Sequence, residues 1–170
     1  MSDKVPFEAV RSDFIEKSGL ISQAEGLPRI AGRVFGLLIF DGEMVSFGAL
    51  ATRLQVSRAS ISSSIRLLEE RGLIKRMTKP GERQDFFQLA PNPYATMLEG
   101  IQKRTQSTRD DIADTIASLP SDADAVERLK EYADFYASLD SAVAVALQEL
   151  TNARNKPASK QPQTSKDKSK

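Results

Sequence analysis

Five serines and one arginine crowd the stretch from Ser57 to Ser64, within the segment VSRASISSSIRLLEERGLIKR that runs from Val56 to Arg76. Their hydroxyl and guanidinium groups can hydrogen-bond to phosphates and to the edges of bases. Serine is a mediocre helix former, because its hydroxyl competes for nearby backbone groups. A segment that keeps the apolar spacing of a helix despite so many serines needs a reason beyond helix stability.

A helix over this segment separates its side chains onto two faces. At about 100° per residue, Ile61, Ile65 and Leu68 fall within one narrow stripe. The opposite face is small, hydroxylated and basic, whereas an ordinary solvent-exposed helix favours long Glu and Lys side chains. Small side chains let a helix enter the major groove of DNA, so this face is predicted to contact DNA. The face includes Ala59, Ser62, Ser63 and Arg66.

The preceding segment supplies a partner for this helix. A short helix is predicted over 47–54, with Ser46 as its N-cap. A tight QVS turn then leads to Ser57, which is predicted to cap the serine-rich helix. Two short helices joined by such a turn, with a polar face exposed on the second, make a helix-turn-helix.

The following segment is predicted to form a hairpin. Gly72 ends the serine-rich helix, and two strands are expected over 73–78 and 85–89, joined by a turn at Pro80-Gly81. Such a hairpin corresponds to a wing, and Arg83 is best placed to enter a minor groove, which attracts arginine. The basic residues around the hairpin are Lys75, Arg76, Lys79 and Arg83.

Longer helices are predicted on both sides of this core. One amphipathic helix covers 6–23, a second runs from Pro28 to about Phe40, and a third begins at Pro93 and ends before Pro120. The last helix runs to about Arg154 and carries a heptad seam. The seam consists of Leu129, Tyr132, Tyr136, Leu139, Val143, Ala146 and Leu150.

Charge is unevenly distributed along the chain. Residues 57–83 hold seven basic and three acidic side chains, a net +4, whereas residues 84–150 hold five and twelve, a net −7. The whole chain carries only +1. A basic segment beside an acidic one favours a surface that meets a polyanion on one side.

The composition excludes several function classes. The chain has no Cys and no His, which removes thiol chemistry, imidazole metal sites and the commonest general base. No nucleophile–base pair or Gly-rich phosphate loop is present, so no enzyme activity, cofactor or metal is expected. No apolar run approaches the roughly 20 residues of a membrane span, and no signal pattern opens the chain, so a cytoplasmic protein is expected.

The segment FGALATRLQVSRASISSSIRLLEERGLIKRMTKPGERQDFFQL resembles the winged-helix core of MarR-type transcriptional regulators. The preceding LPRIAGRVFGLLIF is similar to a helix of the GbsR-like branch. The resemblance covers roughly residues 27–90. It implies a homodimer that binds a palindromic operator in double-stranded DNA, and a small effector that changes the spacing of the recognition helices.

The fold expected from these observations is mainly α with a small β wing. The predicted divisions are an N-terminal dimerisation helix (1–25), a winged helix-turn-helix domain (26–91), C-terminal dimerisation helices (92–155) and a disordered basic tail (156–170). The resemblance and the basic residues of the hairpin together imply a set of DNA contacts. These are Ser57, Arg58, Ser60, Ser62, Ser63, Arg66, Arg76, Lys79 and Arg83.

Two questions stay open at the level of sequence. Tyr132, Phe135 and Tyr136 cluster on the last helix and are candidates for an aromatic cage around a cationic effector. The favoured alternative is that these rings form part of a dimer core, because aromatic side chains chiefly supply buried area. The protein is predicted to be a dimeric, sequence-specific DNA-binding regulator, a repressor relieved by its effector. The alternative is a winged-helix protein-interaction module with weak or no DNA binding.

Overall fold

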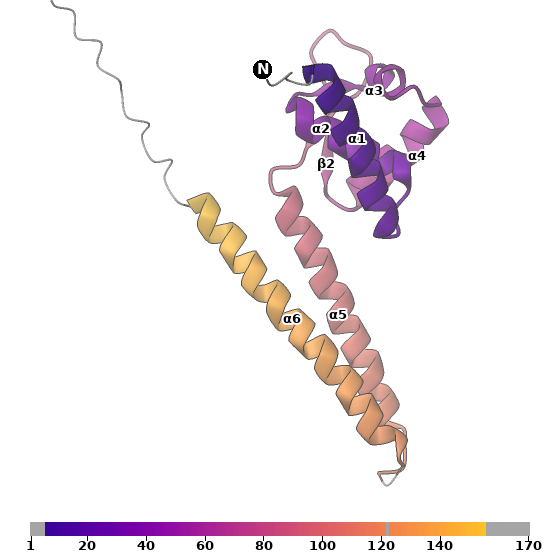
Figure 1. Cartoon of the computed structure of the whole chain (residues 1–170), viewed down its shortest axis with the longest axis vertical. Helices are drawn as coiled ribbons and strands as arrows, with labels where there is room; N and C mark the ends of the chain where they lie inside the picture. The colour runs from indigo at the N-terminus through magenta and orange to yellow at the C-terminus, as the bar shows by residue number, and fades with distance from the viewer. Residues whose placement is uncertain (1–5, 122, 156–170) are drawn as a thin grey trace, which may run out of the picture. The chain divides into compact units, whose positions relative to one another are not determined.

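A computed structural model of the chain describes residues 6–121 and 123–155, and the predicted tail, residues 156–170, lies outside the described residues. The chain divides into two compact units, Met1–Ile101 and Gln102–Lys170 (Figure 1). Helices dominate both units, as predicted. Within the described part of the chain, no helix is long and apolar enough to cross a membrane.

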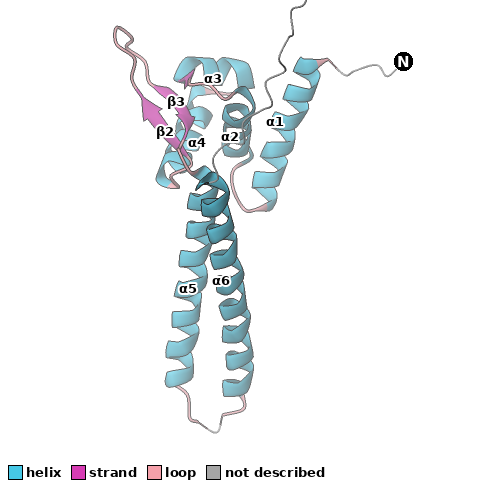
Figure 2. Ribbon diagram, turned by 90° about the vertical axis from the view of Figure 1, so that its left-hand side faces the viewer, coloured by secondary structure: helices cyan, strands magenta, loops and turns pink. Residues whose placement is uncertain are grey.

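The first unit holds four helices and a small antiparallel sheet. Its helices are α1 (Phe7–Ala24), α2 (Arg29–Asp41), α3 (Phe47–Leu54) and α4 (Arg58–Glu70). The three strands lie in the order β1-β3-β2, and Figure 2 shows β2 and β3 as a hairpin that extends beside α4. The strands are β1 (Val45–Ser46), β2 (Ile74–Met77) and β3 (Phe86–Leu89).

One apolar core holds the first unit together. Its centre is α2, whose buried side chains pack against those of α3, α4 and the sheet. Ile61, Ile65 and Leu68 are each at most 2% exposed. The apolar stripe predicted for the serine-rich helix is therefore confirmed. The other deeply buried members include Val34, Leu37, Leu38, Val45, Leu50, Leu54, Ile74 and Phe87.

Helices α1 and α2 approach each other very closely along a seam of small residues. A Cβ placed on Gly32 would overlap Ser22 Oγ and would lie 2.6 Å from the carbonyl oxygen of Ser18. A Cβ on Gly36 would lie 2.5 Å from Ser18 Cβ. The GxxxG spacing of Gly32 and Gly36 therefore serves close helix packing inside this unit.

A carboxylate at the end of α2 ties three helices together. Arg11 of α1 donates from Nε and Nη2 to the two oxygens of Asp41, at 2.6 Å each. Arg53 of α3 donates to Asp41 Oδ2 at 3.1 Å and to Glu43 Oε1 at 3.0 Å. The Asp41 side chain is only 11% exposed. Hydrogen bonding from Arg11 lowers the pKa of Asp41 below its usual range.

Asp41→Asn is expected to lower the free energy of unfolding near pH 7 by about 2 kcal/mol, because it removes charge-assisted hydrogen bonds. A carboxyl whose pKa is lowered by folding contributes stability above its ordinary pKa of about 3.9. That stability is lost as the pH falls through the lowered pKa. Urea titrations from about pH 7 to about pH 2 should therefore show the gap between wild type and variant closing in acid.

The matched control is Asp13→Asn, which breaks an exposed pair with Lys17 on the same helix. Its expected effect is below about 1 kcal/mol, since exposed ion pairs contribute little. A gap for Asp41→Asn that stayed constant down to the lowest pH would contradict the assigned role of the Arg11–Asp41 pair.

The second unit is built from two long helices. Helix α5 (Pro93–Ala117) begins in the first unit and continues into the second, where it lies antiparallel to α6 (Ala125–Asn155) (Figure 2). Ile112 and Val143 are buried, and Arg109 pairs with Asp140 at 3.6 Å. The predicted heptad seam on α6 is only partly covered within this chain, since Tyr132 and Leu150 are 48% and 38% exposed.

Candidate DNA interface

Serine caps position both helices of the helix-turn-helix. Ser46 Oγ accepts a hydrogen bond from the Ala49 N–H at 3.2 Å, and Ser57 Oγ accepts one from the Ser60 N–H at 3.1 Å. Both caps were predicted and are confirmed. The turn between the helices places Gln55 in the left-handed region, at φ 53°, which redirects the chain from α3 into α4.

The serines of α4 do not share one role. Ser64 is buried at 3% exposure, and Ser63 Oγ donates to the Ala59 carbonyl at 2.7 Å. The Ser57 and Ser60 hydroxyls lie 2.9 Å apart, where either can donate to the other. Ser62, by contrast, is exposed and has no hydrogen-bond partner among the described residues. Of the five hydroxyls, that of Ser62 is therefore the most available to a ligand.

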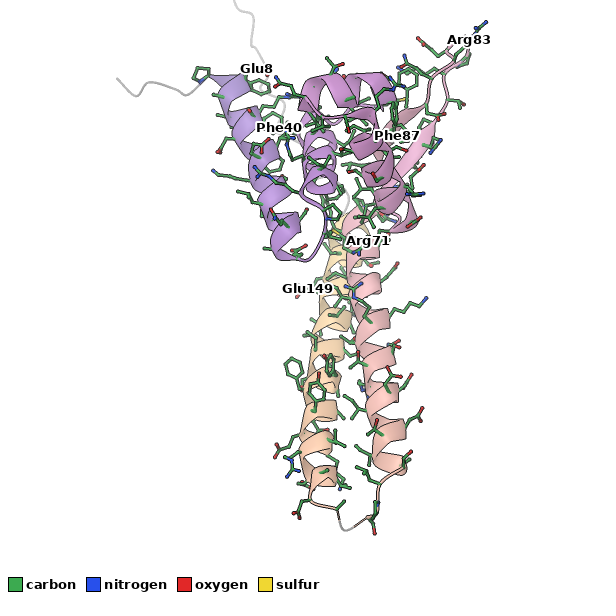
Figure 3. The ribbon with its side chains drawn as sticks, turned by 90° about the vertical axis from the view of Figure 1, so that its right-hand side faces the viewer. Glu8, Phe40, Arg71, Arg83, Phe87 and Glu149 are labelled. Carbon is green, nitrogen blue, oxygen red and sulfur yellow. The ribbon has the colours of Figure 1, made fainter. Side chains whose placement is uncertain are left out.

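Among the predicted DNA contacts, two arginines, Arg66 and Arg83, are exposed and make no ion pair or ring contact within the described part of the chain. Arg66 lies on the same exposed face of α4 as Ser62. Arg83 lies at the tip of the β2–β3 hairpin and points away from the helices of the first unit (Figure 3). Together they present positive charge on the exposed face of α4 and at the tip of the hairpin.

Two other predicted cations rest on aromatic rings. The Arg58 guanidinium lies 4.8 Å from the centroid of Phe47, and Lys79 Nζ lies 4.3 Å from the centroid of Phe86. Such contacts orient a cation while leaving its charge in place. Both residues remain exposed and hold their charge beside α4 and the hairpin.

Arg76 is the predicted contact whose surroundings differ most from the sequence expectation. Its guanidinium donates to Glu69 from Nε and Nη2, at 3.2 and 3.0 Å, and to Asp85 from Nη1 at 2.8 Å. These interactions raise the pKa of Arg76 above its usual range. The hydrogen bond to Glu69 contributes most, and Asp85 adds to it. Glu69 and Asp85 are visible in the sequence, but they meet Arg76 only in the folded hairpin.

The aromatic residues of α6 contact one another. Tyr132 and Phe135 each meet Tyr136 edge to face, with ring centroids 5.1 and 5.2 Å apart. The two tyrosine hydroxyls lie 3.3 Å apart. Phe7 and Phe14 pack instead on Phe40 in the first unit. The three α6 rings thus contact one another, while Tyr132 and Phe135 remain 48% and 59% exposed.

Comparison with known proteins identifies the family. The sequence model of the MarR family matches residues 25–84, which extend from just before α2 into the wing. The HTH-type transcriptional regulator MmpR5 of Mycobacterium tuberculosis (strain ATCC 25618 / H37Rv) is 34% identical over 148 residues, or 85% of this chain and 89% of that protein. The chain belongs to the MarR family. It is thus a DNA-binding transcriptional regulator and not an enzyme.

A solved structure supports the same assignment at the level of the fold. A crystal structure described as that of a transcriptional regulator superimposes with a TM-score of 0.71, at 29% sequence identity. The match covers 84% of this chain and 99% of the other. The predicted winged-helix fold is therefore confirmed, and regulators of the MarR family bind DNA and form dimers.

Proposed function

We propose that this MarR-family protein is a homodimeric repressor that binds a two-fold-symmetric operator in a sequence-specific manner. In this proposal α4 enters the major groove, and Arg83 at the wing tip enters the adjacent minor groove. The observation that carries it is the exposed face of α4, where Ser62 and Arg66 have no partner among the described residues. Ser57, Arg58, Ser60, Ser63 and Lys79 would contact the flanking backbone.

The homodimer is supported by apolar side chains that the chain leaves exposed at both ends. On α1, Phe7, Val10 and Ile21 lie along one stripe and are 69%, 46% and 60% exposed. On α6, Phe135 is 59% exposed beside Tyr132. Large apolar side chains that recur along one exposed helix face favour an interaction site there. A second copy of the chain would cover these stripes, and residues 1–25 and 92–155 are accordingly proposed as its dimerisation segments.

The finer assignments rest on sequence. LPRIAGRVFGLLIF, which forms most of α2 and its approach, supports placing the protein in the GbsR-like branch of the family. Membership of that branch would bring a small effector that changes the spacing of the recognition helices. A cytoplasmic location follows from the proposed role on DNA, and the basic residues of the tail would add sequence-independent attraction to phosphates.

Arg83→Ala is expected to weaken operator binding roughly tenfold or more, because the substitution removes the charge proposed to enter the minor groove. The slope of log K against log salt should also become shallower, by about one for each Arg83 that neutralises a phosphate. Fluorescence anisotropy on the DNA upstream of the protein's own coding region, compared with random duplex across a salt series, measures both.

Lys103→Ala is the matched control, since it removes one exposed positive charge from α5 of the second unit. It should leave affinity and slope close to those of wild type. Equal binding of wild type to the upstream DNA and to random duplex would refute sequence-specific regulation at that site. An Arg83→Ala variant indistinguishable from Lys103→Ala would refute the wing contact alone.

A further inference from the structure

We propose that Arg76 is a positioning residue that fixes the wing against the recognition helix, and that it does not contact DNA. With Glu69 and Asp85 it forms what we call the wing clamp. The inference deepens the proposed function, because it assumes that the wing must hold a defined orientation to deliver Arg83. It also reverses the sequence-based prediction that counted Arg76 among the DNA contacts.

The clamp adds side-chain links between elements that the backbone joins through a tight turn and a short strand ladder. Glu69 lies in the last turn of α4, Arg76 in β2, and Asp85 just before β3. The carbonyl of Asp85 also accepts a hydrogen bond from the Phe47 N–H at 3.0 Å, at the start of α3. A single guanidinium therefore links the recognition helix, both sides of the hairpin and, through Asp85, the helix that precedes the turn.

Apolar packing alone does not fix the position of the hairpin against α4. A groove of about 260 Å³ lies between α4 and the hairpin, bordered by Ser62 and Arg66 on the helix and by Phe87 on the strand. Phe87 is the cross-strand partner of Arg76, and its ring centroid lies 5.3 Å from the guanidinium. Glu69, Arg76 and Asp85 line this groove as well, so the ion network spans a gap that the apolar core beneath it does not fill.

The same geometry argues against contact with a phosphate. Nε, Nη1 and Nη2 of Arg76 all donate to carboxylates already. Arg76, Glu69 and Asp85 together carry a net charge of −1, which repels a phosphate. The bidentate contact to Glu69 uses the planar fork that makes Arg distinct from Lys, which presents a compact ammonium.

Glu69→Gln distinguishes a positioning role of Arg76 from a DNA contact, because the two roles predict opposite changes in operator affinity. If the clamp positions the wing, the loss of the Glu69 charge loosens the wing and weakens operator binding, by about fivefold. If Arg76 were instead a DNA contact held back by Glu69, the same substitution would release it and tighten binding. Glu70→Gln is the matched control, because it removes the same charge from the neighbouring exposed residue, which has no partner among the described residues.

The effect of the wing clamp on operator affinity should depend on the presence of Arg83. In an Arg83→Ala background, Glu69→Gln should cause a clearly smaller further loss of affinity, because only Lys79 of the wing is then left to be positioned. Arg76→Lys should weaken binding about as much as Glu69→Gln although it conserves charge. Tighter binding by Glu69→Gln, or losses that add fully in the Arg83→Ala background, would overturn the proposal.

A second readout needs no DNA and so stands even if the operator is not found. The chain has no Cys, so Glu82→Cys at the wing tip gives a single site for a nitroxide spin label. Arg76→Ala should make this label more mobile in the electron paramagnetic resonance spectrum of the free protein, whereas Lys75→Ala, on the same strand, should not. Exposed ion pairs contribute little to stability, so both variants should fold. An unchanged spectrum in Arg76→Ala would overturn the clamp, whereas a failure of wild type to prefer its operator would refute only the proposed function.

Discussion

Ser62→Glu is expected to reduce operator binding by about a hundredfold or more while leaving the fold intact. Ser62 lies on the exposed face of α4 and has no partner among the described residues, so the substitution breaks no internal contact. Glutamate is also a better helix former than serine. The new carboxylate would stand against the phosphates of the groove, where juxtaposed like charges cost several kcal/mol. Anisotropy titrations on the operator measure the loss, and circular dichroism measures the retained fold.

Ser107→Glu provides the matched control. Ser107 is an exposed residue of α5 in the second unit, so the same change in charge and volume falls outside the proposed interface. Its affinity should stay within about twofold of wild type, since a single exposed charge outside the interface is screened at physiological salt. Equal losses in the two variants would mean that net charge, and not the face of α4, governs binding.

The elements that position the interface were predictable because their determinants are local. Ser46 and Ser57 each accept a hydrogen bond from the backbone N–H three residues ahead, a relation visible in sequence. The 3.6-residue period that placed Ile61, Ile65 and Leu68 inward depends likewise only on neighbours along one helix. Gly72 adopts φ 67° where α4 ends, a conformation that glycine accepts readily.

Contacts between residues that are far apart in the sequence could not be predicted in this way. Arg11 and Asp41 are 30 residues apart, and no periodicity states which arginine will meet which carboxylate. Arg76 meets Glu69 and Asp85, seven and nine residues away, only once the hairpin has folded back on α4. A sequence therefore shows where basic residues gather, but not which of them are already occupied within the chain.

The heptad seam shows a related limit on α6. Its spacing predicts that seven residues share one face, yet Val143 is buried while Tyr132 and Leu150 are exposed. Periodicity defines a face and leaves open what covers it. Within this chain α5 covers part of that face, and the remainder is available to the proposed second copy.

Gly32→Ala is expected to lower the free energy of unfolding of the first unit by about 3 kcal/mol, the upper end of the usual cost of overpacking. The added methyl group would overlap Ser22 Oγ and approach the carbonyl oxygen of Ser18 at 2.6 Å. A serine hydroxyl can rotate away, but the Ser18 carbonyl belongs to the backbone of α1. Relief therefore requires α1 to move off α2, which would disturb the nearby ion pairs that join these helices, such as that of Arg33 with Glu16. Urea unfolding followed by circular dichroism measures the loss.

The control, Gly48→Ala, makes the same substitution in helix α3, where the nearest atom to the new Cβ would be Gln84 Oε1 at 3.8 Å. With room available, alanine should stabilise the helix by up to about 1 kcal/mol relative to glycine. Opposite signs for the two variants would show that steric contact along the α1–α2 seam, and not helix propensity, determines the effect at Gly32. Stabilisation by both would mean that α1 is not held against α2 as closely as the seam indicates. In that case α1 could move independently of α4, and a change at the proposed dimer interface on α1 would not be transmitted directly to the recognition helix.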